Sequence, residues 1–317
     1  MIRLYGLYGV ILSVCLTMAA MSVQPTAQVR PVSAAVEPAP SPTPLPRGIQ
    51  LGLGSLETEP CLIPEEKLWA GKLMLIDPQH PLPEAAPAPN TLSAASLGAP
   101  VRSPQTLAAE ETVRAAREWL YAARVKGYLS PVVWAGARSK EQQLDWQLDQ
   151  LRYYAQFHSL EEAARLAARE REAPGCSEHQ TGWALDIRLC ESYALPPDEK
   201  PLSDSEAGRY LLDTCWRYGF IRRYKNHPCP EEAFHFRYVG QAHAEMITAL
   251  GLPFEKYLSF LHEAQALRYY DRGELKYVII CQPARGDWQL RKPRGFTALE
   301  VSYDNQGWAV AIFSACR

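Results

Sequence analysis

The sequence has no excess of charge of either sign. Its 317 residues contain 33 Lys and Arg against 35 Asp and Glu, which gives a net charge of −2 at pH 7. A nucleic-acid-binding protein would show a basic excess, so this balance argues against one. No block of like charges points to a polyanionic partner, and no internal repeat is present. With 47% hydrophobic and 21% charged residues, the composition is that of a globular protein of one large or two ordinary domains.

A long apolar run stands at the N-terminus. Arg3 is followed by an uncharged, mostly apolar stretch over residues 5–23. One positive residue before such a run is typical of a secretory signal peptide. The run is also about as long as a membrane span of roughly 20 residues, so an uncleaved signal-anchor fits equally. Val14 is too large for the residue before a lipidated Cys15, and either remaining case predicts export.

Composition divides the rest of the chain into a spacer and two folded regions. Residues 24–48 are rich in Pro, Ala, Ser and Thr without apolar periodicity, and we place a linker at 24–67. Residues 68–252 mix helical and strand patterns and are predicted to form the main domain. Residues 253–317 predict a helix and then a small β-rich appendage, because 277–316 alternate β-branched and aromatic residues with turns.

Periodicity locates individual elements of the main domain. A helix is expected over 105–126, ending before Gly127, because its apolar residues have helical spacing. These residues are Leu107, Val113, Ala116 and Leu120. The other expected elements are a strand and loop within LWAGKLMLIDPQHPLP (68–83), a strand over 131–137, a helical segment over 139–172 broken near His158 and Ser159, and a helix capped by Ser203 that runs to Tyr218.

The stretch CSEHQTGWALDIRLC (176–190) contains two side chains that suit a metal ion. His179 offers an imidazole nitrogen and Asp186 a carboxylate oxygen. GWALDIRL has the pattern of a strand on which Leu185 and Ile187 face the core and Asp186 the other side. Gly182 permits a turn between the two candidate ligands. By residue type alone, two such residues seven apart are more often unrelated polar groups.

A second cluster favours the metal interpretation. EEAFHFRYVG (231–240) places Glu232 three residues before His235, in a segment with strand-like FHFRYV. A catalytic zinc site needs three protein ligands, which leave one position for water, and a nearby carboxylate that takes the proton of that water. The alternative is that His235 is a hydrogen-bonded core histidine and Glu232 a solvated loop carboxylate.

Four motifs in this order resemble those of the VanY-type D-alanyl-D-alanine carboxypeptidases, which are LAS zinc metallopeptidases. Residues 177–186 match the pattern SxHxxGxAxD. GARSKEQQ (136–143) is similar to GYRSxxxQ, YGFIRRY (218–224) to YGFxxRY, and EAFHFRYVG (232–240) to EPWHFRYVG. The resemblance covers roughly residues 68–250. It implies an α+β, hedgehog-like fold with a central antiparallel sheet and flanking helices.

The resemblance also implies a metal site and a base. His179, Asp186 and His235 would bind Zn²⁺. Glu232 would be the general base that activates water and then protonates the leaving amine.

The same resemblance implies three residues that contact the substrate. Arg138 would stabilise the oxyanion or hold the substrate carboxylate, a role that suits its planar guanidinium. Ser177 and Gln143 would help to position the peptide terminus.

This chain departs from the family pattern next to the expected base. Ala233 and Phe234 replace the usual Pro-Trp, which changes a pocket wall but removes no proton acceptor. The preceding loop reads KNHPCPE (225–231) instead of the usual Lys and Thr-Gly turn. This loop introduces Glu231 as a rival base and His227 as an alternative metal ligand.

Seven cysteines lie outside the leader, and export favours disulfides over metal binding. Zinc sites closed by four protein ligands leave no position for water, so Cys176 and Cys190 are better explained as a disulfide or as buried thiols. Because seven is odd, at least one cysteine is free or paired with another chain. Two further pairs are plausible, Cys215 with Cys229 and Cys281 with Cys316. The seventh cysteine is Cys61, and sequence alone does not determine the connectivity.

The resemblance implies an exported zinc carboxypeptidase of the bacterial cell envelope that removes the C-terminal D-Ala of peptidoglycan stem peptides. Its alternatives are an L,D-carboxypeptidase that acts on tetrapeptide stems and a peptidoglycan endopeptidase. A non-catalytic wall-binding module of the same fold is the alternative from another class. A monomer is favoured, with peptidoglycan as partner and the N-terminal segment as a possible membrane anchor.

Overall fold

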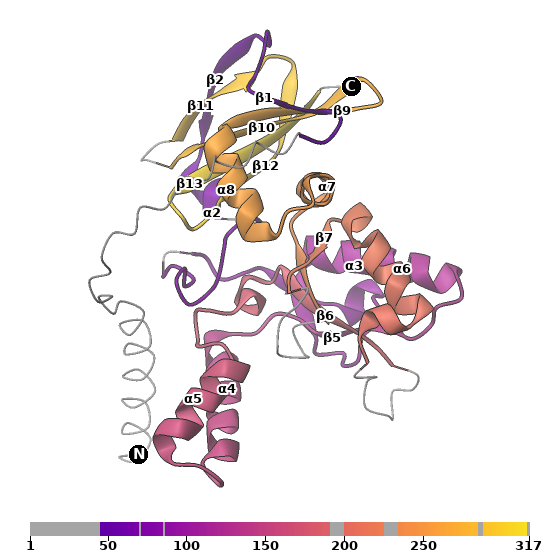
Figure 1. Ribbon diagram of the computed structural model, residues 1–317, viewed down its shortest axis with the longest axis vertical. Helices are drawn as coiled ribbons and strands as arrows, with labels where there is room; N and C mark the ends of the chain where they lie inside the picture. Colours follow the sequence, from indigo (N-terminus) through magenta and orange to yellow (C-terminus); the bar gives the residue numbers. More distant parts are fainter. Residues whose placement is uncertain are drawn as a thin grey trace, which may run out of the picture. The chain divides into compact units, whose positions relative to one another are not determined.

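The computed structural model describes residues 45–69, 71–84, 86–190, 200–224, 234–284 and 288–315. Contacts divide the chain into two compact units. The described part of the smaller unit is Gln143–Ala173, and the larger unit comprises the chain from Pro46 to Gln142 and from Pro174 onward. Figure 1 labels the helices and strands of both units. No helix among the described residues has the length and apolar character that crossing a membrane requires.

The smaller unit is a pair of helices. Helix α4 spans Lys140–Tyr154, with its first residues in the larger unit, and α5 spans Leu160–Glu170. Ser159 caps α5, because its side chain accepts a hydrogen bond from the backbone N–H of Glu162. The break expected near residues 158–159 is therefore confirmed. The buried apolar residues of the pair are Leu151, Ala163, Ala164 and Ala167.

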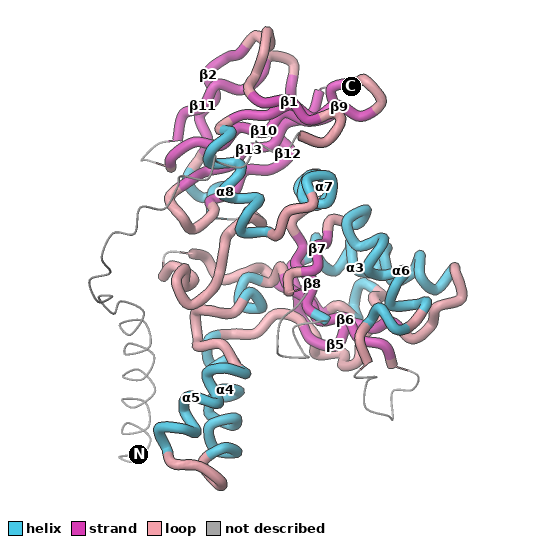
Figure 2. Tube along the Cα trace, viewed as in Figure 1, coloured by secondary structure: helices cyan, strands magenta, loops and turns pink. Residues whose placement is uncertain are grey.

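A four-stranded antiparallel sheet forms the centre of the larger unit. Its order is β5 (Pro131–Ala135), β6 (Ala184–Leu189), β8 (His235–Tyr238) and β7 (Phe220–Arg222). Helices α3 (Glu110–Val125) and α6 (Glu206–Thr214) lie beside it (Figure 2). As expected, Leu185 and Ile187 of β6 point into the core between sheet and helices. The α+β fold with a central antiparallel sheet is thus confirmed.

Trp119 of α3 is the largest side chain of this core. It is fully buried, and its ring lies 5.2 Å from that of Phe220 and 5.1 Å from that of Phe236. Aromatic pairs at these separations add to the stabilisation from buried area alone. The packing fixes β7 and β8 against α3, and β8 carries His235.

Two local expectations for this core are wrong. Leu107 belongs to strand β4 (Leu107–Ala109), which pairs with β3 (Thr91–Ser93), and its side chain is exposed. Its helical spacing was coincidental, because α3 begins only at Glu110. Helix α6 is capped by Ser205, whose hydroxyl accepts from the N–H of Gly208, and not by Ser203. The chain then continues as the 3-10 helix η4 (Cys215–Tyr218).

The C-terminal part of the larger unit is rich in strands. A five-stranded sheet has the order β1 (Ile49–Leu51), β9 (Ala266–Asp271), β10 (Glu274–Pro283), β13 (Trp308–Ala315) and β12 (Phe296–Tyr303). β11 (Trp288–Pro293) pairs with β2 (Thr58–Ile63). Helices α7 (Gln241–Leu250) and α8 (Phe254–Ala264) connect this region, the β module, to the central sheet. The expected helix and β appendage are confirmed.

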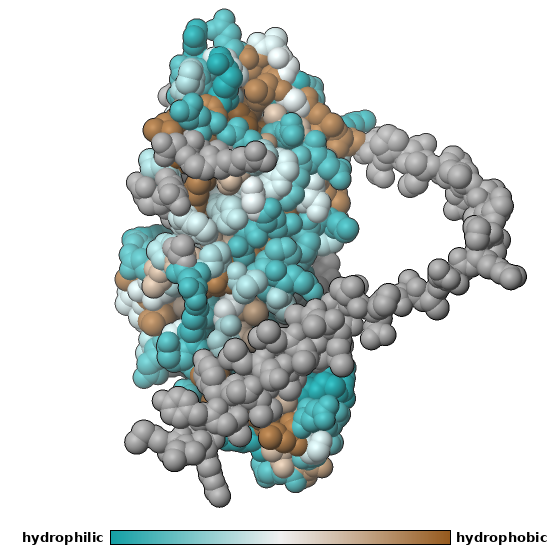
Figure 3. Space-filling view, turned by 90° about the vertical axis from the view of Figure 1, so that its left-hand side faces the viewer, coloured by the Kyte–Doolittle hydropathy of each residue, from teal (hydrophilic) through white to brown (hydrophobic). Residues whose placement is uncertain are grey.

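The β module extends further toward the N-terminus than its sequence pattern suggests. Strands β1 and β2 lie within residues 49–63, inside the expected linker, so the linker bounds of 24–67 are wrong here. β1 pairs with β9 and β2 with β11, more than 200 residues away. These strands are short and their partners remote, so no local periodicity reveals them. Polar and apolar side chains are mixed on the surface seen in Figure 3. Leu51 of β1 and Leu62 of β2 are both exposed.

The segment after residue 70 ties the two sheets of the larger unit together. Leu73 to Ile76 are buried as expected, but the described residues over 71–77 form no strand. Instead, the N–H of Leu73 donates to Ser302 Oγ (2.8 Å), and that of Leu75 to the carbonyl of Asp304 (3.0 Å). A Cβ on Gly71 would meet Ser302 at 2.3 Å, so only glycine permits this approach.

The remaining elements of the larger unit are short. They are α2 (Glu65–Trp69), η1 (Ala95–Leu97), η2 (Glu178–Thr181) and η3 (Leu202–Asp204).

The expected disulfides are not formed by the described cysteines. Cys190 is a free buried thiol, so it forms no disulfide with Cys176. For Cys190 the second possibility, a buried thiol, is therefore the correct one. Cys281 is also free, and burial raises the pKa of its thiol to about 12. Cys229 and Cys316 lie outside the described residues.

Candidate metal centre

The fold brings together the three side chains that the sequence singles out as metal ligands. His179 lies in η2, Asp186 in β6 and His235 in β8, where it is paired with Asp186 in the strand register. One potential ligand atom of each lies within 4.8 Å of the others. Gly182 makes this possible, because it ends η2 with φ of 74° and so turns the chain into β6.

Hydrogen bonds determine which ring nitrogen of His179 faces the site. Its Nδ1 lies 2.7 Å from the carbonyl of Gly136, which can only accept, so Nδ1 carries the proton. Nε2 then points to Asp186 Oδ1 at 3.3 Å. An imidazole held through one nitrogen by a backbone carbonyl has the arrangement typical of a metal ligand.

His235 is held from both sides by carboxylates. Its Nδ1 lies 3.1 Å from Asp186 Oδ1, and its Nε2 lies 3.0 Å from Glu178 Oε2. The ring of His235 packs edge-on against that of His179, with centroids 4.8 Å apart. Nδ1 of His235 and Nε2 of His179 therefore face the same carboxylate, and these three groups can coordinate one ion.

Glu178 is the residue of this site that sequence reasoning missed. Its side chain is fully buried, and besides His235 it accepts a hydrogen bond from Arg223 Nε at 2.8 Å. Arg237 Nη1 lies 3.6 Å away. A buried carboxylate is stable only with such partners. A signal was available, because Arg237 stands in the apolar strand pattern FHFRYV, where a buried arginine needs an acidic partner.

The charges of this cluster are set by its neighbours. Burial would raise the pKa of Glu178, but Arg223 and Arg237 hold it well below its usual range. Burial would lower the pKa of His235, but the carboxylates of Asp186 and Glu178 outweigh it and raise the value to about 10. Burial and Arg138 lower the pKa of His179. In the metal-free protein His235 is thus cationic and His179 neutral at pH 7.

Of the three predicted substrate residues, Arg138 and Ser177 lie together, whereas Gln143 belongs to the smaller unit. Arg138 Nη2 donates to Ser177 Oγ at 3.4 Å, and the backbone N–H of Arg138 donates to the carbonyl of His179 at 3.2 Å. Arg138 also lines a hollow of about 580 Å³. Gln143 belongs to the smaller unit, is buried, and donates to the carbonyl of Glu172 at 2.8 Å. Its role at the substrate stays a prediction.

The expected general base cannot be placed. Glu232, its rival Glu231 and the alternative ligand His227 all lie outside the described residues.

Residues 105–241 match a family model described as VanY, D-alanyl-D-alanine carboxypeptidase. The resemblance inferred from the four motifs is confirmed. This match contains the candidate ligands, Glu178, Arg138 and Ser177.

This chain is similar to several curated proteins, among them two from Enterococcus. The bifunctional D-Ala-D-Ala dipeptidase and D-Ala-D-Ala carboxypeptidase VanXYC of Enterococcus gallinarum is 36% identical over 102 residues, which are 31% of this chain and 53% of the relative. A D-alanyl-D-alanine carboxypeptidase of Enterococcus faecalis is 33% identical over 144 residues, 44% of this chain and 50% of the relative. The chain thus spans about half the length of each.

The fold is also shared with a solved structure. The vancomycin resistance D,D-dipeptidase VanXYg, in complex with a D-Ala-D-Ala phosphinate analog, superposes with a TM-score of 0.64 and 21% identity. The superposition covers 81% of this chain and 99% of that one. At this identity the likeness concerns the fold.

Proposed function

We propose that this protein is a zinc-dependent carboxypeptidase that removes the C-terminal D-Ala from peptidoglycan stem peptides. The observation that carries the proposal is the convergence of His179, Asp186 and His235 within the segment that matches the VanY family. The two curated relatives, both named for D-Ala-D-Ala carboxypeptidase activity, support the substrate class.

The side chains of the site fit a zinc ion. Two imidazole nitrogens and one carboxylate are a common zinc donor set, and three protein ligands leave the fourth position open for water. Both histidines have their outer nitrogens occupied, by Gly136 and Glu178, so the inner nitrogens are presented to the ion. A bound zinc ion supplies a water of lowered pKa and polarises the scissile carbonyl.

The other residues of the chain bind the peptide and move protons. The guanidinium of Arg138 and the hydroxyl of Ser177 lie together and supply donors for a terminal carboxylate or a developing oxyanion. By resemblance, Glu232 takes a proton from the attacking water and returns it to the leaving amine. Glu178, with both carboxylate oxygens engaged, is unsuited to that role.

The proposed substrate also suggests a location. Peptidoglycan lies outside the cytoplasm, so the proposal requires export, which is what the N-terminal 23 residues predict. Whether they are cleaved or remain as an anchor distinguishes a secreted enzyme from a membrane-attached one. We propose a monomer, because the three candidate ligands complete a metal site without a residue from a second copy.

The proposal is tested with the purified full-length protein and synthetic stem peptides. With zinc, D-Ala should be released from a pentapeptide stem, and chelator should stop the release. A Glu232→Ala variant should lose activity, whereas Glu231→Ala should keep it. Activity that survives chelation, or a fully active Glu232→Ala variant, would contradict the mechanism. Release from tetrapeptide stems alone indicates an L,D-carboxypeptidase, internal cleavage an endopeptidase, and wall binding without hydrolysis a silent module.

A further inference from the structure

A second hollow lies beside the candidate metal centre and takes no part in it. Its volume is about 470 Å³, and none of the described residues that line it is a candidate ligand. Trp183, on its wall, directly precedes β6, which carries Asp186 three residues later. Gln180, also on its wall, directly follows the candidate ligand His179, so the hollow adjoins the metal centre and is within reach of neighbouring residues of a bound peptide.

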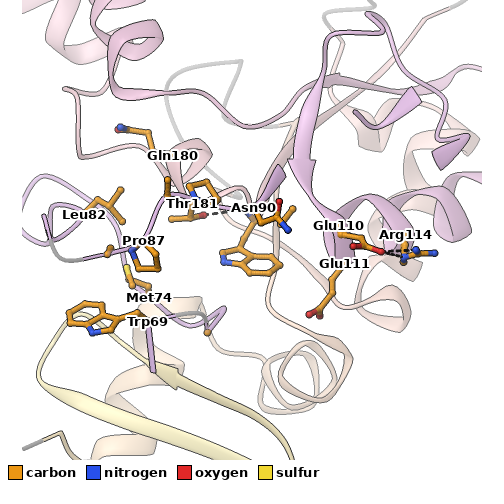
Figure 4. Close-up of a pocket in the computed structure, with 16 residues that line it drawn as sticks. Trp69, Met74, Leu82, Pro87, Asn90, Glu110, Glu111, Arg114, Gln180 and Thr181 are labelled. Atoms are coloured by element: carbon orange, nitrogen blue, oxygen red, sulfur yellow. Dashed lines mark hydrogen bonds and ion pairs between the residues drawn. The ribbon is translucent and has the colours of Figure 1, made fainter. Parts of the chain in front are cut away.

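The two sides of the hollow differ in chemistry. In Figure 4, Trp69, Met74 and Pro87 lie on one side, and Glu110, Glu111 and Arg114 on the other. Trp69 ends α2 and packs on Tyr303 of the β module, with ring centroids 5.0 Å apart, whereas the acidic side is the first turn of α3. Pockets at such junctions, with apolar walls and a few polar groups, are typical of ligand sites.

The charges around the hollow do not balance. Glu110 is paired with Arg114 at 2.6 Å. The single ammonium of Lys72 lies between two carboxylates, 2.9 Å from Glu300 and 3.1 Å from Glu111. The Glu300 side chain is 11% exposed and also accepts the backbone N–H of Lys72, whereas the Glu111 side chain is 59% exposed. The surplus negative charge therefore resides on Glu111, at the wall of the hollow.

The aromatic surface here already faces an ammonium group. Nζ of Lys72 lies 5.2 Å from the centroid of the Trp183 ring, a cation–π distance. A second indole, that of Trp69, belongs to the same hollow. Indole rings together with an exposed, incompletely neutralised carboxylate attract a primary ammonium more strongly than an uncharged or anionic group.

We propose that this hollow binds a primary ammonium group on the substrate, carried by the side chain of a stem-peptide residue upstream of the scissile bond. Glu111 accepts its hydrogen bonds beside the indole of Trp183, and Trp69 on the opposite wall contacts the apolar part of the same side chain. This inference rests on the proposed function, because it takes the ligand to be the peptide whose C-terminus reaches the metal centre. It gives the site a preference for stems that contain a diamino acid with a free amine.

The test compares two pentapeptide stems that differ only in whether the third-residue lysine amine is free or acetylated. The zinc-loaded protein should cleave the free-amine stem with about 10-fold higher kcat/KM, a size expected for one desolvated cation–π and ion-pair contact. Glu111→Gln should abolish this preference by slowing cleavage of the free-amine stem to about the rate of the acetylated stem. Glu118→Gln, an exposed carboxylate farther along α3, is the matched control and should keep the preference.

Binding without catalysis separates the failure of this inference from the failure of the proposed function. The probe is a tripeptide stem that ends in lysine and lacks D-Ala, titrated by calorimetry into the metal-free protein. Weaker binding of the acetylated tripeptide, and of the free tripeptide to Trp69→Leu or Glu111→Gln, supports the hollow even if no stem is hydrolysed. Equal binding of the two tripeptides would contradict the ammonium site. Equal cleavage of the two stems would contradict it as well, while supporting the carboxypeptidase activity.

Discussion

The two sheets of the larger unit are stabilised by different means. Around the central sheet, Glu178, Arg223, Arg237 and His235 are all buried and share one network of hydrogen bonds and charges. The β module buries mainly apolar side chains along β10 and β13. Buried charge networks contribute little net stability compared with apolar packing, but their geometry is specific. The difference indicates that the polar network of the central sheet fixes the geometry of a site, whereas the β module contributes mainly apolar packing.

Besides α7 and α8, residues 72–74 join the two regions. Arg237 Nη2 donates to the carbonyls of Lys72 and Met74, at 3.0 and 3.2 Å. The backbone N–H of Lys72 in turn donates to Glu300 of β12 at 3.1 Å. The β module is therefore connected through residues 72–74 to Arg237, which lies beside the carboxylate that holds His235.

The largest expected effect is confined to the central sheet. Asp186→Ala should lower kcat/KM by about 1,000-fold or more, because it removes one of the three proposed ligands of a zinc ion that would supply several kcal/mol of transition-state stabilisation. Steady-state kinetics and the zinc content of the purified variant check this. Full zinc content with full activity would show that the three side chains are not the ligands.

A core truncation in the β module should affect stability and not chemistry. Phe313 is fully buried, and Phe313→Ala should lower the free energy of unfolding by about 3–5 kcal/mol, the usual cost of such a cavity. Denaturant unfolding measures this, with Leu62→Ala on an exposed site as the control. At temperatures where the variant is folded its kcat/KM should match the wild type. A large loss of activity in the folded variant would mean that the β module shapes the site directly.

Glu178→Gln tests the network that distinguishes the central sheet. The variant keeps the size of the side chain but loses the charge that holds His235, so zinc affinity should fall about 10- to 100-fold, as for other outer-shell partners of metal ligands. Competition with a chromophoric chelator measures the affinity. Glu255→Gln, which removes the other, partly exposed carboxylate on Arg223, is the control and should bind zinc normally. Unchanged affinity in Glu178→Gln would show that Arg223 and Arg237 need this carboxylate only for folding.

The pH dependence of the metal-free protein is the mildest test. The pKa of His235 is raised from 6.5 to about 10, so the cationic ring stabilises the fold below pH 6.5, and this stabilisation is lost as the pH rises through 10. The free energy of unfolding should fall by about 1 kcal/mol per pH unit in this window. His179 does not interfere, because its pKa is lowered. A His235→Asn variant should lack this slope, and an equal slope in both proteins would assign it to other groups.

Much of the site could be predicted because its ligands stand in local patterns. The alternation in GWALDIRL put Leu185 and Ile187 in the core and Asp186 on the other side, and the structure agrees. The turn expected at Gly182 between His179 and Asp186 is also present. The predictions that failed depended on remote partners. Strands β1 and β2 pair with segments more than 200 residues away. Leu73 and Leu75 donate to side-chain and backbone groups of the β module instead of forming a ladder.

The amino-acid sequence by itself determined the candidate ligands, the order of the motifs and the α+β character, since these follow from residue chemistry and from periodicities of a few residues. Only the tertiary structure decided how Glu178 is used, because its partners His235, Arg223 and Arg237 lie 45 or more residues along the chain. The same holds for the hollow between Trp69 and Glu111, whose walls come from distant segments. A buried charged side chain needs partners of opposite charge or hydrogen-bond partners, and the tertiary structure determines which residues these are.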